Sequence, residues 1–198
     1  MISAYQLKPR FQQLLVPFLR FLHRQGITPN FLTISAVVLS LLIGLSLWFV
    51  SRIPALIWVV PFGLLVRMAL NALDGMMART YHMQSRLGEV LNELGDVVAD
   101  ALVYLPLIAL LPQWQFLVWA FVLLSVVNEY AGILGKALGG ERRYDGPMGK
   151  SDRAFTIGLS CLLIGFWSGF ANYFPIVLGV AIVLVIVSTV VRIQKALI

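Results

Sequence analysis

The sequence has little charge and almost no cysteine. Only 12% of its 198 residues are charged, whereas soluble domains average about 25%. This scarcity excludes an ordinary water-exposed surface and predicts that most of the chain faces lipid. The single cysteine, Cys161, excludes an intrachain disulfide. Because no Ser/Gly-rich linker, low-complexity segment or internal repeat divides the chain, we expect one domain over residues 1–198.

Apolar residues make up 60% of the chain and gather in segments of about 20 residues, the length that a membrane-spanning helix requires. Six spans are predicted, at residues 31–51, 54–79, 87–111, 114–138, 153–171 and 174–195. The third is the weakest candidate because it contains acidic residues. Residues 3–24 combine an apolar face with basic residues, which is typical of a helix lying in the membrane interface. The predicted fold is an all-α polytopic membrane protein with six transmembrane helices and an N-terminal interfacial amphipathic helix.

Basic residues are distributed unevenly among the predicted loops. They precede the first span, flank the second and fourth loops and end the chain, whereas the opposite loops contain only Arg52. By the positive-inside rule, both termini lie on the cytoplasmic side. The net charge of +6 follows from these loops. Nucleic-acid recognition is excluded because the basic patch is short and is interrupted by acidic residues.

Acidic residues are concentrated in one region of the chain. Five of the nine lie between Asp74 and Asp100, within otherwise apolar segments. At about 100° per residue, Asn92 and Asp96 share one face of the third span. Asn71 and Asp74 likewise share one face of the second span. Because neither polar face can be left in lipid, we expect the two faces to meet at the cytoplasmic ends of these spans.

Carboxylates placed this close together repel one another unless a cation neutralises them. The oxygen-only ligand set favours a hard divalent ion, Mg²⁺ or Mn²⁺, with a bound phosphate completing its shell. A purely structural polar contact is the alternative, and Glu89 fits an ordinary interfacial position equally well. The small residues Gly75, Ala78 and Gly88 would let a bulky polar ligand approach the backbone.

The motif in this region resembles that of the CDP-alcohol phosphatidyltransferase family, Asp-x2-Asp-Gly-x2-Ala-Arg-x8-Gly-x3-Asp-x3-Asp. Every spacing is met here, by Asn71, Asp74, Gly75, Ala78, Arg79, Gly88, Asn92 and Asp96. The stretch "PNFLT", Pro29 to Thr33, is similar to a frequent family signature at the start of the first span. The resemblance covers essentially the whole chain, and "RMALNALDGM" is similar to a bacterial branch of the family.

This resemblance implies a transferase of phospholipid biosynthesis in which an alcohol displaces CMP from a CDP-linked donor, with CDP-diacylglycerol the expected donor. In the family, four aspartates hold two divalent ions that bind the donor's pyrophosphate. Carried over by position, Asp74 is a metal ligand, and Asp96 is both a ligand and the general base. Donor contacts are implied at Asn71, Asp74, Gly75, Ala78, Arg79 and Gly88. The resemblance also implies a homodimer in the bacterial inner membrane.

Asn71 and Asn92 replace the first and third aspartates of the family motif. Each keeps an oxygen that can ligate a cation, but the formal charge of the four positions falls from four negative to two. Binding of two ions should therefore be weaker. Three outcomes are open: Glu93, alone or with Glu89, serves as a replacement ligand, one ion suffices, or the ligand is bound without turnover. The last describes a catalytically impaired relative that binds nucleotide or lipid or acts as a regulator. A transporter is disfavoured, because the acidic residues cluster at one membrane side.

The predicted fourth loop, "GGERRYDGPMGKSDRAF", concentrates basic residues: Arg142, Arg143, Lys150 and Arg153. Two roles fit equally well. One is contact with anionic headgroups, worth roughly 1 kcal/mol per basic residue. The other is a pocket for an anionic acceptor such as a polyol phosphate, with Lys150 and Arg153 the stronger candidates because they adjoin the fifth span. In the second span, Arg67 is expected to form a structural ion pair with Glu129.

Overall fold

The computed structural model describes residues 4–198, which form helices joined by turns and loops. Its α-helices are α1 (Ala4–Arg24), α2 (Pro29–Trp48), α3 (Val59–Thr80), α4 (Arg86–Tyr104), α5 (Gln115–Ala137), α6 (Lys150–Phe166) and α7 (Phe174–Ala196). Short 3-10 helices lie between them at η1 (Pro54–Trp58), η2 (Leu105–Ala109), η3 (Pro112–Trp114) and η4 (Ser168–Asn172). The prediction of an all-α fold is confirmed.

Several of these helices are suited to a membrane by length and composition. Within the described residues, four segments qualify: Pro29–Trp48, Pro54–Thr80, Pro112–Ala137 and Phe174–Ala196. The two remaining long helices of the bundle differ for physical reasons. Helix α4 carries Glu89, Glu93, Asp96 and Asp100, and α6 has only 17 residues and begins with a charged turn. The protein is thus polytopic and integral to the membrane.

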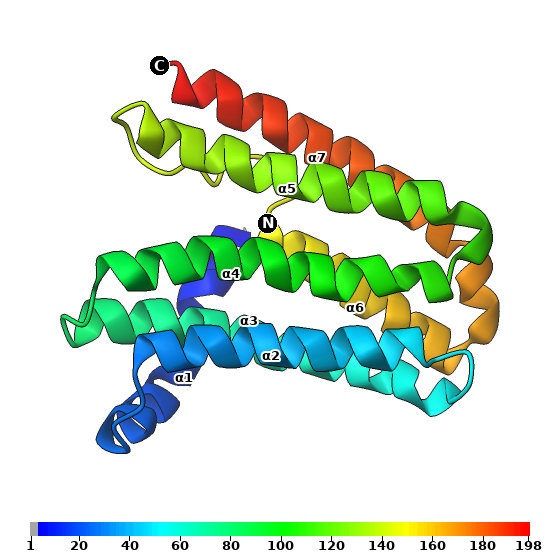
Figure 1. The fold of residues 1–198 in the computed structure, drawn as a ribbon, viewed down its shortest axis with the longest axis horizontal. Coiled ribbons are helices and arrows are strands. Elements are labelled where there is room, and N and C mark those ends of the chain that lie inside the picture. Colours follow the sequence, from blue (N-terminus) through cyan, green and yellow to red (C-terminus); the bar gives the residue numbers. More distant parts are fainter. Residues whose placement is uncertain (1–3) are drawn as a thin grey trace.

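Helices α2 to α7 run roughly along one direction, and α1 lies at a steep angle to them (Figure 1). Helix α2 packs against both α3 and α4, α5 packs against α7, and α3 packs against α6. The α3–α4 turn, the α5–α6 loop and the C-terminus lie at the same end of the bundle, on the left in Figure 1. The fold therefore brings the acidic stretch and the basic loop to one end.

The interior of the bundle is apolar. Side chains from the six helices α2 to α7 form the main core, among them Ile43, Leu64, Phe121, Ile157 and Phe174. A second apolar cluster packs α1 against α2 and α3 and consists of Leu19, Leu32, Leu73 and Met77. Many large apolar side chains are instead exposed on the outer faces of α2, α3, α5 and α7. Such extensive apolar exposure is typical of a surface that contacts lipid.

Side-chain caps set the starts of two helices that carry the site. Thr28 precedes α2, and its hydroxyl accepts a hydrogen bond from the Phe31 amide at 3.3 Å. Pro29 then occupies the first turn, where its missing N–H leaves no bond unmade. Ser85 caps α4 in the same way, accepting from the Gly88 amide at 3.0 Å. These caps begin α2 at the "PNFLT" stretch and place Gly88 in the first turn of α4.

The contact between α3 and α4 differs from the prediction that their polar faces meet directly. Over the described residues the two helices do not pack closely on each other, because α2 packs against both. The close α2–α4 approach depends on Gly44, where any β-carbon would collide with the backbone carbonyl of Leu102. The polar faces of α3 and α4 therefore meet through long side chains. Arg67 of α3, for example, reaches Asp100 of α4.

Candidate functional site

Asp74 is buried on α3, and α2 holds its carboxylate in place. The Thr33 hydroxyl lies 2.9 Å from Asp74 Oδ2 and also 3.1 Å from the Pro29 carbonyl oxygen. The other carboxylate oxygen accepts from the amide of Gly75. None of the ion pairs among the described residues includes Asp74. The "PNFLT" stretch thus supplies a direct partner of the site, a role that the sequence pattern did not reveal.

Asp96 is buried on α4 and forms an ion pair with Lys150, the first residue of α6. Lys150 and Asp96 both interact electrostatically with Asp74. Three charged side chains from α3, α4 and α6 therefore occupy one region. The sequence pattern placed Asp74 and Asp96 together, and Lys150, which was expected in an anion pocket, pairs with Asp96 in the structure.

The other predicted residues of the motif surround these side chains. Asn71 and Asn92 are half-buried, about one turn before Asp74 and Asp96 respectively. Gly75 and Ala78 continue along α3 and are half-buried, whereas Arg79 is exposed near the end of that helix. At Gly88, a β-carbon would lie 2.8 Å from the Asn30 side-chain oxygen, so a larger residue would require the Asn30 side chain to move.

Glu93 does not lie free beside Asn92. Its carboxylate is 2.7 Å from Arg142 of the α5–α6 loop, and the same guanidinium lies 3.0 Å from Glu129 of α5. Arg142 also stacks over the Tyr144 ring, with its guanidinium carbon 4.4 Å from the ring centre. Glu89 pairs with Lys136 at the surface. Both acidic residues proposed as replacement ligands are thus already matched by basic side chains.

Buried ion pairs connect the middle of the bundle. Arg153 is fully buried, and its Nη2 lies 2.8 Å from Asp100 and 2.9 Å from Glu129. Arg67 pairs with Asp100 at 2.5 Å, so the expectation that Glu129 would be its partner was wrong. The reason is the packing order, which places Glu129 beside Arg142, Arg153 and Arg192 instead. A structural ion pair for Arg67 is confirmed.

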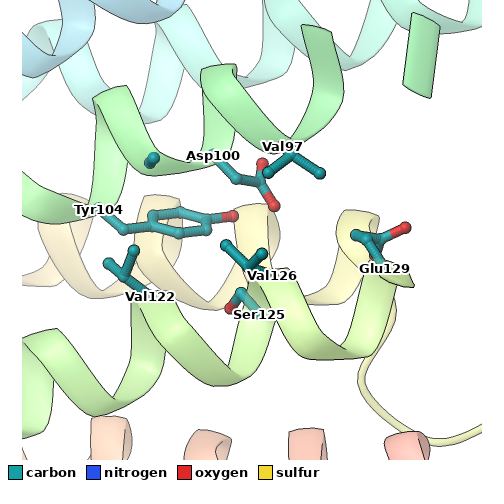
Figure 2. A pocket seen from close by; sticks show the side chains of 8 residues that line it. Val97, Asp100, Tyr104, Val122, Ser125, Val126 and Glu129 are labelled. Atoms are coloured by element: carbon teal, nitrogen blue, oxygen red, sulfur yellow. The ribbon is translucent and has the colours of Figure 1, made fainter. Parts of the chain in front are cut away.

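The space between α4 and α5 at this network is closed. Figure 2 shows Asp100 and Tyr104 of α4 directed toward α5, with Ser125 and Glu129 opposite. The fissure is too narrow to hold a water molecule. It therefore belongs to the packed core of the bundle and offers no space for a ligand.

The α5–α6 loop is bound to α5 and α7. The side-chain amide of Asn128 donates to the Met148 carbonyl oxygen at 3.2 Å, and the backbone N–H of Met148 donates to Ser188 Oγ at 2.8 Å. At the surface, Asp145 lies 2.5 Å from Lys195, and this ammonium holds the pKa of the carboxyl below its usual range. The loop thus has a defined path that ends at Lys150.

The four basic residues predicted to share an anion pocket lie in different surroundings. Lys150 is at Asp96, Arg142 is at Glu93, and Arg153 is buried within the ion-pair network. Arg143 is half-buried, and its amide donates to the Gly132 carbonyl at 3.0 Å. Of the four, Lys150 alone contacts a residue of the family motif at the site. Arg153 lies three residues further along α6 and is held by Asp100 and Glu129.

An apolar hollow of about 250 Å³ lies between α2 and α4, next to Asp74. It is lined by Thr33, Ile34, Val37, Val38, Leu91, Leu94, Gly95 and Val98. Thr33 is the residue whose hydroxyl bonds to Asp74, so the polar site and the apolar hollow share a wall. This neighbourhood suits a ligand with a charged head and an apolar tail.

The donor atoms at the site are of the chemical kind that hard divalent ions prefer. No group of three or more His, Cys, Asp or Glu side chains gathers in a metal-binding arrangement within the described part of the chain. Two carboxylates and two amides are nevertheless available, from Asp74, Asp96, Asn71 and Asn92. All are oxygen donors, which Mg²⁺ and Mn²⁺ prefer.

Fold and site together define a polytopic membrane protein with a charged centre toward one end of its bundle. The sequence profile of the CDP-alcohol phosphatidyltransferase family matches residues 26–192. The inner membrane protein YnbA of Escherichia coli (strain K12) is 38% identical over 196 residues, which cover 99% of this chain and 97% of that protein. The chain belongs to the CDP-alcohol phosphatidyltransferase family.

Solved structures share the fold. Phosphatidylinositol phosphate synthase (PgsA1) of Mycobacterium tuberculosis with CDP-DAG bound superposes with a TM-score of 0.77 at 20% identity, covering 93% of this chain and 94% of that one. The same enzyme in complex with manganese and citrate gives a TM-score of 0.76 at 20% identity, covering 91% and 88%. At this level of identity, the likeness establishes the fold alone.

Proposed function

We propose that the protein is a membrane phosphotransferase of phospholipid biosynthesis in which an alcohol displaces CMP from a CDP-linked donor. The placement of Asp74, Asp96 and Lys150 together carries this proposal. Two buried carboxylates beside an ammonium group can bind a phosphate-bearing ligand with its cation and accept a proton. If Asp96 and Lys150 formed only a structural ion pair, nothing would require a second carboxylate, Asp74, to be buried nearby without a basic partner.

The donor in this proposal is CDP-diacylglycerol. The apolar hollow beside Thr33 provides a surface for an acyl chain next to the charged centre. Gly75, Ala78 and Gly88 are small residues at which the donor's phosphates would approach the backbone, and the Arg79 guanidinium lies beside Gly75. The PgsA1 structure with CDP-DAG bound supports the same donor for this fold.

Asp96 acts as the general base in the proposed reaction. It takes the proton from the acceptor hydroxyl, whose oxygen then bonds to the phosphorus that carries the diacylglycerol. The bond from this phosphorus to the bridging oxygen breaks, and CMP leaves with that oxygen. Mg²⁺ or Mn²⁺ held by Asp74, Asp96 and the amide oxygens of Asn71 and Asn92 would offset the negative charge of the phosphates.

The acceptor is an alcohol or a phosphorylated polyol. Lys150 offers three N–H donors and uses its ion pair with Asp96 to face the reacting oxygen. Arg142 and Arg143 lie on the loop that leads to it, and Arg142 connects this loop to α4 through its ion pair with Glu93. Arg153 contributes by supporting the first turn of α6, since its side chain is buried.

The proposed topology has six spans. Helices α4 and α6 complete the four apolar spans, and α1 lies in the interface with both termini and the active site on the cytoplasmic side of the inner membrane. Helix α4 can enter the membrane because its carboxylates pair with basic residues inside the bundle. Homodimerisation is part of the proposal and follows from the family.

A second candidate function is favoured by Asn71 and Asn92. These residues remove two negative charges, so the chain could bind a CDP-linked lipid without turning it over and act as a binding or regulatory protein. The two functions differ in one measurable property, which is metal-dependent release of CMP.

The test uses purified protein with CDP-diacylglycerol, Mn²⁺ or Mg²⁺ and a mixed pool of polar alcohols and polyol phosphates. We expect CMP release that requires the metal and falls to background in Asp96→Asn. Asp145→Asn, the same change at a surface carboxylate, should retain full activity. Bound CDP-diacylglycerol with no CMP release under any acceptor would favour the binding protein.

A further inference from the structure

Almost every carboxylate of α3 and α4 forms an ion pair with a basic side chain. Glu89 pairs with Lys136, Glu93 with Arg142, Asp96 with Lys150 and Asp100 with Arg67 and Arg153. Asp74 is the exception among these helices, because its partners are the Thr33 hydroxyl and a backbone amide. The negative charge left for an added cation is therefore concentrated at Asp74.

We infer that the site takes a single divalent cation at Asp74 and that the Lys150 ammonium supplies the second positive charge, at Asp96. This inference rests on the proposed function for the identity of the cation. Asp74, Asp96 and Lys150 carry a formal charge of −1 together, and the two asparagines add none. A second divalent ion would have to bind beside the ammonium or displace it, and like charges a few Å apart repel strongly even at an effective dielectric constant of about 20.

Lys150 is held in place by the surrounding structure. It opens α6, whose start is capped by a 2.9 Å hydrogen bond from the Gly149 amide to Asp152. Met148, two residues before Lys150, is hydrogen-bonded to Asn128 of α5 and to Ser188 of α7. The Lys150 side chain is only 24% exposed. The ammonium is thus a fixed part of the charged centre, unlike a mobile surface lysine.

Glu93 does not restore the missing negative charge. Arg142 lies 2.7 Å from Glu93, and Glu129 shares the same guanidinium. Breaking this pair to ligate a metal would leave a partly buried guanidinium with fewer partners, which is costly. Of the open routes to a working site, a single ion requires no rearrangement of the observed ion pairs.

The experiment counts Mn²⁺ bound to the purified protein in detergent, without donor or acceptor, from the electron paramagnetic resonance signal of free Mn²⁺. We expect one Mn²⁺ per chain for the wild type and none for Asp74→Asn. Lys150→Met combined with Asn92→Asp should bind two, because it removes the ammonium and adds a carboxylate. Lys136→Met, which breaks a surface pair at Glu89, should leave the count at one.

Two Mn²⁺ per wild-type chain, or none at millimolar Mn²⁺, would overturn the inference. So would a count reduced by Glu93→Gln, since Glu93 would then be a ligand. If the double variant does not fold, Lys150→Gln alone decides: Mn²⁺ binding at least threefold tighter supports the inference, and unchanged or weaker binding contradicts it. One Mn²⁺ per chain without any CMP release would leave this inference standing and overturn the transferase function instead.

Discussion

The Arg153 guanidinium of α6 lies 2.8 Å from the Asp100 carboxylate of α4, and both side chains are buried. Asp100 also pairs with Arg67 of α3, and Arg153 also pairs with Glu129 of α5. Four helices therefore meet at ion pairs inside the bundle. Because Arg153 stands one turn from Lys150, this network also fixes one side of the candidate site.

Replacing Arg153 should destabilise the protein strongly. Arg153→Met leaves Asp100 and Glu129 buried with fewer positive partners, and breaking a buried pair from one side costs about 3–5 kcal/mol. Equilibrium unfolding in mixed detergent micelles measures this loss. Lys195→Met, which removes the exposed partner of Asp145, should cost at most about 1 kcal/mol. Equal losses from the two variants would show that the buried network adds no special stability.

The helical period predicted the inward positions of Asp74 and Asp96, but it placed Glu89 on the same face of α4, and Glu89 lies at the surface. Asp74 and Asp96 lie in one region because the 3.6-residue repeat fixes their faces, and the motif spacing fixes their depth. The partners of these residues were not predictable in the same way. Lys150 reaches Asp96, and Arg67 reaches Asp100, because α2 packs against both α3 and α4 and α6 packs against α3. Packing order of this kind depends on contacts such as that at Gly44, which no local pattern reveals.

The hydroxyl of Thr33 should matter for metal binding. It orients the Asp74 carboxylate at 2.9 Å, and loss of such a supporting hydrogen bond typically weakens metal affinity 10- to 100-fold. Thr33→Val should therefore weaken Mn²⁺ binding about 10-fold, whereas Thr33→Ser should preserve it. Titration of the purified protein with Mn²⁺ gives the comparison. Ser40→Ala is the control on the same helix, because Ser40 donates to the Ala36 carbonyl within α2. Unchanged Mn²⁺ affinity in Thr33→Val would show either that Asp74 is not a metal ligand or that the Thr33 hydroxyl does not support it.

Gly44 should tolerate no side chain. A methyl group there would meet the Leu102 carbonyl, so Gly44→Ala must push α2 and α4 apart. We expect a destabilisation of about 1–3 kcal/mol, as for other overpacked interiors. Gly179→Ala in α7 is the matched control, since nothing lies within 4 Å of the added β-carbon there. That variant should be neutral or slightly stabilising, because alanine favours a helix by about 1 kcal/mol over glycine. Similar unfolding curves for both variants would contradict the close α2–α4 contact.

The six-span topology can be tested with introduced cysteines, because the native Cys161 is fully buried and should not react. Each interhelical loop offers an exposed position, and the substitutions are Arg52→Cys, Gln84→Cys, Gln113→Cys, Glu141→Cys and Ser168→Cys. A membrane-impermeant maleimide applied to intact spheroplasts should label positions 52, 113 and 168, and it should reach 84 and 141 only after the membrane is opened. The mass shift of the labelled protein on a gel reports the result.

This alternation depends on α4 and α6, the two helices whose charges set them apart from the apolar spans. If α4 did not cross the membrane, positions 84 and 113 would react from the same side. Their reaction from opposite sides would show that the carboxylates of α4 are carried into the membrane with their basic partners, as the buried pairs at Asp96 and Asp100 require. Labelling of 84 and 141 from outside would instead reverse the orientation and place the candidate site on the wrong side of the membrane for a cytoplasmic CDP-linked donor.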